Sequence, residues 1–101
     1  MSVSKVVRYR TKPESADENE RLIRAVFAEL AEREPDGVRY AAFRLDDGVS
    51  FVHVVELAEG ENPLPSMAAF REFQAGIDER CAEGPVAADA TPIGSYRLLP
   101  G

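Results

Sequence analysis

A few side chains near the middle of the sequence have the types and spacing needed for chemistry. His53 is the only histidine among the 101 residues, and imidazole can act as a general base or a proton shuttle near neutral pH. Tyr40, Arg44 and Phe51 flank it in the sequence, and together they would suit an aromatic ligand that carries a carboxylate or phenolate. We therefore take His53 as the candidate catalytic residue and the other three as candidate substrate-binding residues.

Each of these residues also has a purely structural interpretation, and the sequence leaves both open. A histidine in a sheet can be a partly buried group that is hydrogen-bonded to the backbone or to a neighbouring side chain. Tyr40 can pack within the sheet, and Arg44 can extend along it to reach solvent at the rim. Phe27, Phe70 and Phe73 indicate core packing more than a ligand site.

The candidate residues sit in a predicted β-hairpin over residues 38–57. Two β-rich runs flank Asp47-Gly48, which is typical of a two-residue type I′ turn with φ > 0 at both positions. The cross-strand pairs are then Arg44 with Phe51, Ala42 with His53, Tyr40 with Val55, and Val38 with Leu57. All of these side chains share one face, because alternate residues of a strand point the same way. The other face is also apolar at its centre, so both faces require cover.

The first half of the chain predicts a strand over residues 3–10 and then a helix. Ser15 and Glu18 form a capping-box pattern at the start of that helix. An apolar stripe at helical spacing follows, made of Leu22, Ile23, Val26, Phe27 and Leu30. Pro35-Asp36-Gly37 ends the helix before the hairpin begins.

The second half predicts a loop over 58–65, a helix with Ser66 as its N-cap, a loop over 86–91 and a strand over 93–99. Gly84-Pro85 is expected to end the helix. The apolar stripe of this second helix is Met67, Phe70, Phe73, Ile77 and Cys81.

The resulting β-α-β-β-α-β order predicts one α+β domain over residues 1–101. It is the ferredoxin-like arrangement, with two helices on one face of a four-stranded antiparallel sheet. The opposite apolar face is left open, and a second copy of the same sheet would cover it. We therefore expect a homodimer.

Composition and missing motifs exclude several function classes. The net charge of −6 disfavours nucleic acid and anionic membranes as partners. With Cys81 as the single cysteine, no internal disulfide or multi-cysteine metal site can form. The sequence contains no glycine-rich phosphate loop, G-x-S-x-G or H-E-x-x-H motif, signal peptide or apolar stretch of membrane-spanning length. We expect a cytoplasmic protein without metal or other cofactor.

The pattern resembles the antibiotic-biosynthesis-monooxygenase-like family of dimeric α/β-barrel proteins. The resemblance covers nearly the whole chain and rests on three stretches: Pro35-Asp36-Gly37 with Tyr40-Ala41-Ala42-Phe43; Phe51 to Glu56; and Phe70 to Gln74. It implies the ferredoxin-like fold, a dimer formed through the sheet, and cofactor-independent oxygen chemistry on aromatic molecules. The chain lacks the tryptophan that the quinone-forming and haem-degrading members use. The resemblance therefore implies no particular catalytic set.

Three functions follow as hypotheses. The first is a cofactor-independent monooxygenase-like enzyme that binds an aromatic or polycyclic small molecule between sheet and helices, with His53 as its base. The second is a non-catalytic small-molecule-binding or accessory protein of the same fold. The third is a protein whose apolar sheet face serves assembly alone.

Overall fold

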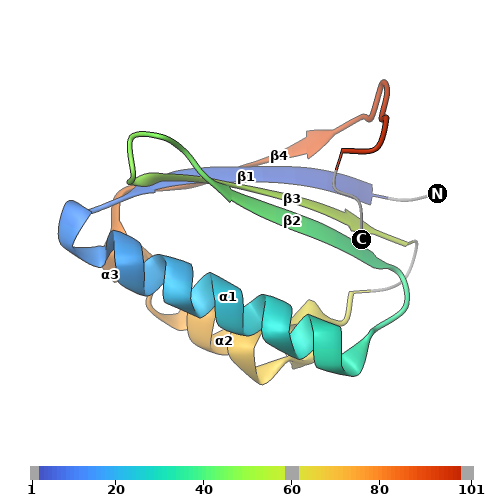
Figure 1. Cartoon of the computed structure of the whole chain (residues 1–101), viewed down its shortest axis with the longest axis horizontal. Helices are drawn as coiled ribbons and strands as arrows, with labels where there is room; N and C mark the ends of the chain where they lie inside the picture. Colours follow the sequence, from blue (N-terminus) through green and yellow to red (C-terminus); the bar gives the residue numbers. More distant parts are fainter. Residues whose placement is uncertain (1–2, 59–61, 99–101) are drawn as a thin grey trace.

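The fold is a four-stranded antiparallel sheet with helices on one side. The computed structural model describes residues 3–58 and 62–98. The strands are β1 (Val3–Thr11), β2 (Val38–Arg44), β3 (Ser50–Leu57) and β4 (Cys81–Ala90), in the spatial order β2-β3-β1-β4. The helices are α1 (Ala16–Arg33), α2 (Ala68–Ala75) and α3 (Ile77–Arg80), with short 3-10 turns η1 (Pro13–Ser15) and η2 (Leu64–Ser66). Helices α1 and α2 run side by side beneath the sheet (Figure 1). The predicted α+β ferredoxin-like fold is confirmed.

The hairpin has the predicted register and a different turn. Arg44 pairs with Phe51, Ala42 with His53 and Tyr40 with Val55, as the sequence predicted. The turn is not type I′, because only Gly48 of the Asp47-Gly48 pair has positive φ, at 79°. Instead the carboxylate of Asp47 accepts hydrogen bonds from the backbone N–H groups of Val49 and Ser50, at 2.9 and 2.8 Å. This side chain stabilises a four-residue loop over 46–49, which is closed by a hydrogen bond from the N–H of Leu45 to the carbonyl of Ser50 at 2.8 Å, so the register is preserved.

Helix α1 buries the predicted apolar stripe. Leu22, Ile23 and Val26 are buried, and Phe27 and Leu30 pack partly buried against them. The predicted capping box is wrong, since the Ser15 side chain makes no capping hydrogen bond. Ser15 ends the 3-10 turn η1 with φ −106° and ψ −3°, whereas an N-cap side chain requires an extended backbone.

The second helix is shorter than predicted. It starts at Ala68, after η2, and Ser66 is not its N-cap because the Ser66 hydroxyl donates to the carbonyl of Pro63 at 2.7 Å. The helix is interrupted at Gly76, and the single turn of α3 ends at Arg80. Cys81 therefore begins a strand and does not continue the helical stripe.

The predicted position of the fourth strand is wrong. Residues 81–90 form β4, including Gly84-Pro85, which was expected to end a helix, and most of the predicted loop 86–91. The predicted strand 93–99 lies outside the sheet as far as Leu98, and Leu99 is outside the described residues. So are residues 59–61 of the predicted loop 58–65.

Position in the sequence explains why residues 81–90, and not the predicted segment 93–99, form the fourth strand. Strand β1 offers a free edge directly after α3, so the next segment pairs with it despite its poor β propensity. Pro85 is tolerated because β4 is an edge strand and its pairing with β1 is irregular between Arg8 and Thr11.

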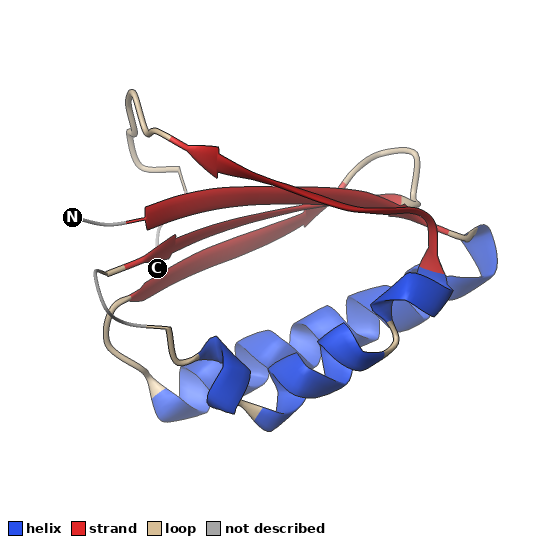
Figure 2. Cartoon of the chain, turned by 180° about the vertical axis from the view of Figure 1, so that it is seen from behind, coloured by secondary structure: helices blue, strands red, loops and turns tan. Residues whose placement is uncertain are grey.

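The two faces of the sheet have different environments. Tyr9, Phe51 and His53 are buried on the face that the helices cover. On the opposite face, which is open in Figure 2, exposed apolar side chains are Phe43, Leu45, Val54 and Val86. None of the helices in the described part of the chain is both long and apolar enough to cross a membrane.

Candidate functional site

A connected group of polar side chains lies buried between the sheet and the helices. It draws one residue from each of five elements: Tyr9 from β1, Asn19 from α1, Tyr40 from β2, His53 from β3 and Arg80 from α3. The strand residues point toward the helices by the alternation of the sheet, and the two helix residues point back. The fold therefore brings together residues up to 71 positions apart, as between Tyr9 and Arg80.

His53 is the centre of the group and is bonded at both ring nitrogens. Nε2 lies 2.8 Å from the hydroxyl oxygen of Tyr9, and Nδ1 lies 2.8 Å from that of Tyr40. The side chain is only 4% exposed. Burial lowers the pKa of His53 from its ordinary value of 6.5 to about 4, because a charged imidazolium would lose its hydration. The ring is therefore neutral at physiological pH.

Both phenols stay protonated in this environment. Burial raises the pKa of Tyr9 to about 12, and the hydrogen bond from Asn19 opposes that change only in part. Burial also raises the pKa of Tyr40 well above its usual range, with a smaller contribution from Tyr9. Two neutral phenols on a neutral imidazole make a hydrogen-bonded wall that can orient a ligand oxygen or pass a proton.

Arg80 holds the far end of the group. Its Nε donates to Oδ1 of Asn19 at 3.0 Å, and its Nη2 donates to the carbonyl of Phe73 at 2.7 Å. Its guanidinium also lies over the Phe73 ring, 5.3 Å from the ring centre. The position depends on Gly76, where a Cβ atom would lie 3.0 Å from Nη1 of Arg80. Both hydrogen-bond acceptors of this buried cation are neutral groups.

The polar wall faces a small apolar cavity, which we call the inner cavity. Its volume is about 150 Å³, and Tyr9, Tyr40 and His53 line it on the sheet side. The remaining lining is mostly apolar: Val7, Val55, Leu64, Phe70, Phe73, Gln74, Ile77 and Pro85. A cavity of this size can hold a single aromatic ring.

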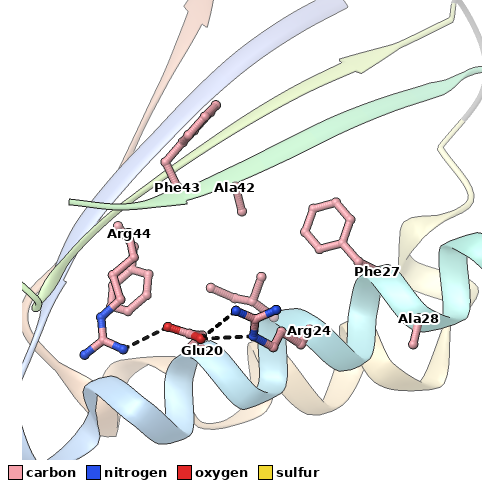
Figure 3. A pocket seen from close by; sticks show the side chains of 9 residues that line it. Glu20, Arg24, Phe27, Ala28, Ala42, Phe43 and Arg44 are labelled. Carbon is pink, nitrogen blue, oxygen red and sulfur yellow. Dashed lines mark hydrogen bonds and ion pairs between the residues drawn. The ribbon is translucent and has the colours of Figure 1, made fainter. Parts of the chain in front are cut away.

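A second hollow, the edge groove, lies between α1 and the β2 edge of the sheet (Figure 3). It measures about 520 Å³ and has Ile23, Phe27 and Phe43 among its apolar lining residues. Arg44 and Arg24 both bond to Glu20 there, at 2.8 and 2.9 Å. The charged side chains of the groove are thus already paired with one another.

The structure divides the predicted site between these two hollows. His53 and Tyr40 are bonded to each other and line the inner cavity. Arg44 lines the edge groove, where it bonds to Asp17, Glu20 and the carbonyl of Gly48. Phe51 is 1% exposed and stacks on Tyr9 at 5.6 Å between ring centres.

Sequence reasoning missed Asn19 and Arg80. A signal for both was present, because each is a polar residue at a stripe position of its helical segment. Asn19 precedes Leu22 and Ile23 by three and four residues, and Arg80 follows Phe73 and Ile77 by seven and three. A polar residue on an apolar stripe must find a buried partner, and these two find each other.

Comparison with solved structures gives many matches over nearly the whole chain. Rv0793 from Mycobacterium tuberculosis superposes with a TM-score of 0.74 at 17% identity, covering 94% of this chain and 98% of that one. A provisionally named antibiotic biosynthesis monooxygenase from Nitrosomonas europaea gives 0.73 at 15% identity, with 91% and 90% covered. SnoaB, a cofactor-independent oxygenase from Streptomyces nogalater, gives 0.68 at 17% identity, with 95% and 97% covered.

The chain has the fold of the antibiotic biosynthesis monooxygenase-like proteins. The resemblance inferred from the sequence pattern is thereby confirmed at the level of fold. Protein-family models and curated proteins give no match to the sequence. In residues 3–58 and 62–98, no three His, Cys, Asp or Glu side chains gather as metal ligands would.

Proposed function

We propose that this monooxygenase-like protein binds a small hydroxylated aromatic molecule in the inner cavity and oxidises it with dioxygen. The observation that carries the proposal is the Tyr9–His53–Tyr40 wall on one side of an otherwise apolar cavity. Apolar walls bind the ring, and a few placed polar groups orient its oxygen. The cavity volume of about 150 Å³ favours one ring over a polycyclic ligand.

The reaction needs no cofactor because the substrate itself reduces dioxygen. A phenol loses two hydrogen atoms and gains one oxygen atom as a quinone carbonyl, and the second oxygen atom leaves as water. The contribution of the protein is to bind the ring, exclude water and bond its oxygen through Tyr40. His53 acts behind the two phenols, since neither of its nitrogens is free to bond the ligand directly.

Oxygen uptake tests the proposal. Native protein supplied with single-ring phenols should consume dioxygen, and mass spectrometry should find quinones that carry one more oxygen atom and two fewer hydrogen atoms than the substrate. The Tyr40→Phe variant should lose most of this activity because it lacks the hydroxyl that orients the substrate. Binding of these rings without oxygen uptake would favour the second function, a non-catalytic binding protein. Absence of both would favour assembly alone.

We also propose a homodimer that buries the open face of the sheet. The exposed apolar side chains of this face are Phe43 on β2, Leu45 in the turn between β2 and β3, Val54 on the central strand β3, and Val86 on β4. The segment after β4 exposes Ile93, Tyr96 and Leu98 as well. A soluble monomer rarely leaves such a set uncovered, and a second copy would cover like with like.

A further inference from the structure

The hydrogen bonds that connect Arg80 to Tyr40 all donate in the same direction. The series begins at the guanidinium of Arg80, which can only donate. A guanidinium has no acceptor, so the bond from Nε of Arg80 fixes Oδ1 as the Asn19 atom that receives it. The Asn19 amide must then turn its Nδ2 toward Tyr9, where it donates to the hydroxyl oxygen at 2.9 Å. The orientation of Asn19 is thus set by Arg80.

Tyr9 passes the direction on to His53. Its oxygen accepts from Asn19, which leaves its own proton to be donated. Among the described residues, the only other partner of this hydroxyl is Nε2 of His53 at 2.8 Å. The reverse arrangement would leave a buried Tyr9 proton without an acceptor, which is costly. Tyr9 therefore donates and Nε2 accepts.

The direction ends at Tyr40. A neutral imidazole carries one proton, so a ring that accepts at Nε2 carries its proton on Nδ1. Nδ1 then donates to the hydroxyl oxygen of Tyr40 at 2.8 Å. No other side chain or carbonyl in the described part of the chain bonds to the Tyr40 hydroxyl, so its proton is available to the inner cavity that Tyr40 lines.

We propose that Arg80 and Asn19 are positioning residues that make Tyr40 a hydrogen-bond donor to the ligand, so that the cavity prefers a phenolate or enolate oxygen. This inference rests on the proposed function of the inner cavity. Each bond polarises the next, so the positive charge of Arg80 strengthens the donor at the far end. Arg80 is 8% exposed and its hydrogen bonds go to neutral acceptors, so no carboxylate bonded to it in the described part of the chain cancels the positive charge that favours an anion.

The tautomer of His53 tests the direction without any ligand. His53 is the only histidine, so its ring signals in a long-range ¹H–¹⁵N spectrum at pH 7 need no assignment. The native protein should show the proton on Nδ1. In Asn19→Asp, a carboxylate of the same shape accepts from both Arg80 and Tyr9. The Tyr9 oxygen should then accept from His53, so the imidazole proton should move from Nδ1 to Nε2. A native ring protonated on Nε2 would overturn the proposal, whatever the variant does.

Ligand preference tests the consequence for specificity. 4-Nitrophenol and its methyl ether 4-nitroanisole are single rings of similar shape, and only the first forms a phenolate. The native protein should bind the phenolate about tenfold or more tightly than the ether. Asn19→Asp and Tyr40→Phe should each remove most of that preference while still binding the ether. An unchanged preference in both variants would contradict the assignment.

Different outcomes of these two measurements contradict the proposed function and the present inference. Native protein that binds neither ring would contradict the proposed function, and with it the ligand half of this inference. The tautomer of His53 would still decide in which direction the hydrogen bonds between Arg80 and Tyr40 donate. Native protein that binds both rings equally would leave the binding function standing and would overturn the preference for an anionic oxygen.

Discussion

The hydroxyl of Tyr9 lies 2.8 Å from Nε2 of His53, although these residues are not paired across their strands. In the register of β1 and β3, Tyr9 is opposite Phe51, and His53 is opposite Val7. The contact is therefore a diagonal one on the helix-covered face, with the two rings 5.4 Å apart. It joins the central strands of the sheet through a polar bond inside an apolar core.

Replacement of His53 by alanine should destabilise the protein strongly. The change leaves a cavity and removes the partner of two buried hydroxyls, each of which adds to the cost. We expect a loss of roughly 2 to 4 kcal/mol and a fall in the melting temperature on the order of 10 °C. The exposed side chain of Glu32 on the outer face of α1 offers a control, and Glu32→Ala should melt within about 2 °C of the native protein. A melt of His53→Ala that matches this control would mean that the hydrogen-bonded wall has little structural weight.

Stability should fall as the solution is acidified from pH 6.5 toward pH 5. The folded pKa of His53 is about 4 and the unfolded value is 6.5, so the unfolded chain binds the extra proton in this window. The stability of the neutral ring is complete above the unfolded pKa and is lost as the pH falls toward the folded one. Urea unfolding should show a loss of roughly 2 kcal/mol between pH 7 and pH 5.

The matched control for this pH dependence is His53→Gln, which has no group that titrates in the window. Carboxylates with lowered pKa values, such as Glu20 and Asp47, lose their stabilising effect at lower pH and affect both proteins alike. Equal slopes for the variant and the native protein between pH 6.5 and 5 would show that His53 is not the group responsible.

Replacement of Glu34 by glycine should stabilise the protein. Glu34 ends α1 in the left-handed conformation, with φ 45° and ψ 54°, which costs a side chain about 1 kcal/mol and costs glycine little. The melting temperature should rise by roughly 5 °C for a domain of this size. Glu32→Gly, at an exposed position inside the same helix, should instead lower it. A fall for both variants would contradict the strain at Glu34.

A charge placed on the open sheet face should break the proposed homodimer. Val54 is 39% exposed at the centre of that face, opposite Val6 and Ala41 on the neighbouring strands. Light scattering should find a dimer of the 11.1 kDa chain for the native protein and a monomer for Val54→Glu. Glu32→Lys, on the outer face of α1, should remain dimeric. A native mass near 11.1 kDa would remove the proposal.

Arg44 provides a test of which hollow binds the ligand. The sequence predicted Arg44 as a substrate-binding residue, and the structure places it in the edge groove with Asp17 and Glu20. If small aromatics bind in the inner cavity, Arg44→Ala should change their affinity less than about twofold, whereas Tyr40→Phe should weaken it about tenfold. Calorimetric titration of both variants distinguishes the sites, and the opposite order of effects would place the ligand in the edge groove.

The sequence by itself determined the element order and the hairpin register. These depend on local patterns, namely alternation along 38–57 and the stripe from Leu22 to Leu30, and burial enforces both. It also identified His53 and Tyr40 as residues of one face. Hydrophobic periodicity was sufficient because each of these segments has one side that must leave water.

Only the tertiary structure decided which segment completes the sheet and which residues complete the site. Residues 93–98 have the better strand propensity, yet β4 forms from 81–90 because that segment reaches the free edge of β1 first. Asn19 and Arg80 belong to residue types that are usually exposed. They are buried here because each supplies the hydrogen-bond partner that the other needs. The pairing of a strand with the edge of a sheet depends on groups distant in the sequence, and so does the hydrogen bonding of polar groups in the core. A local sequence pattern therefore cannot determine either.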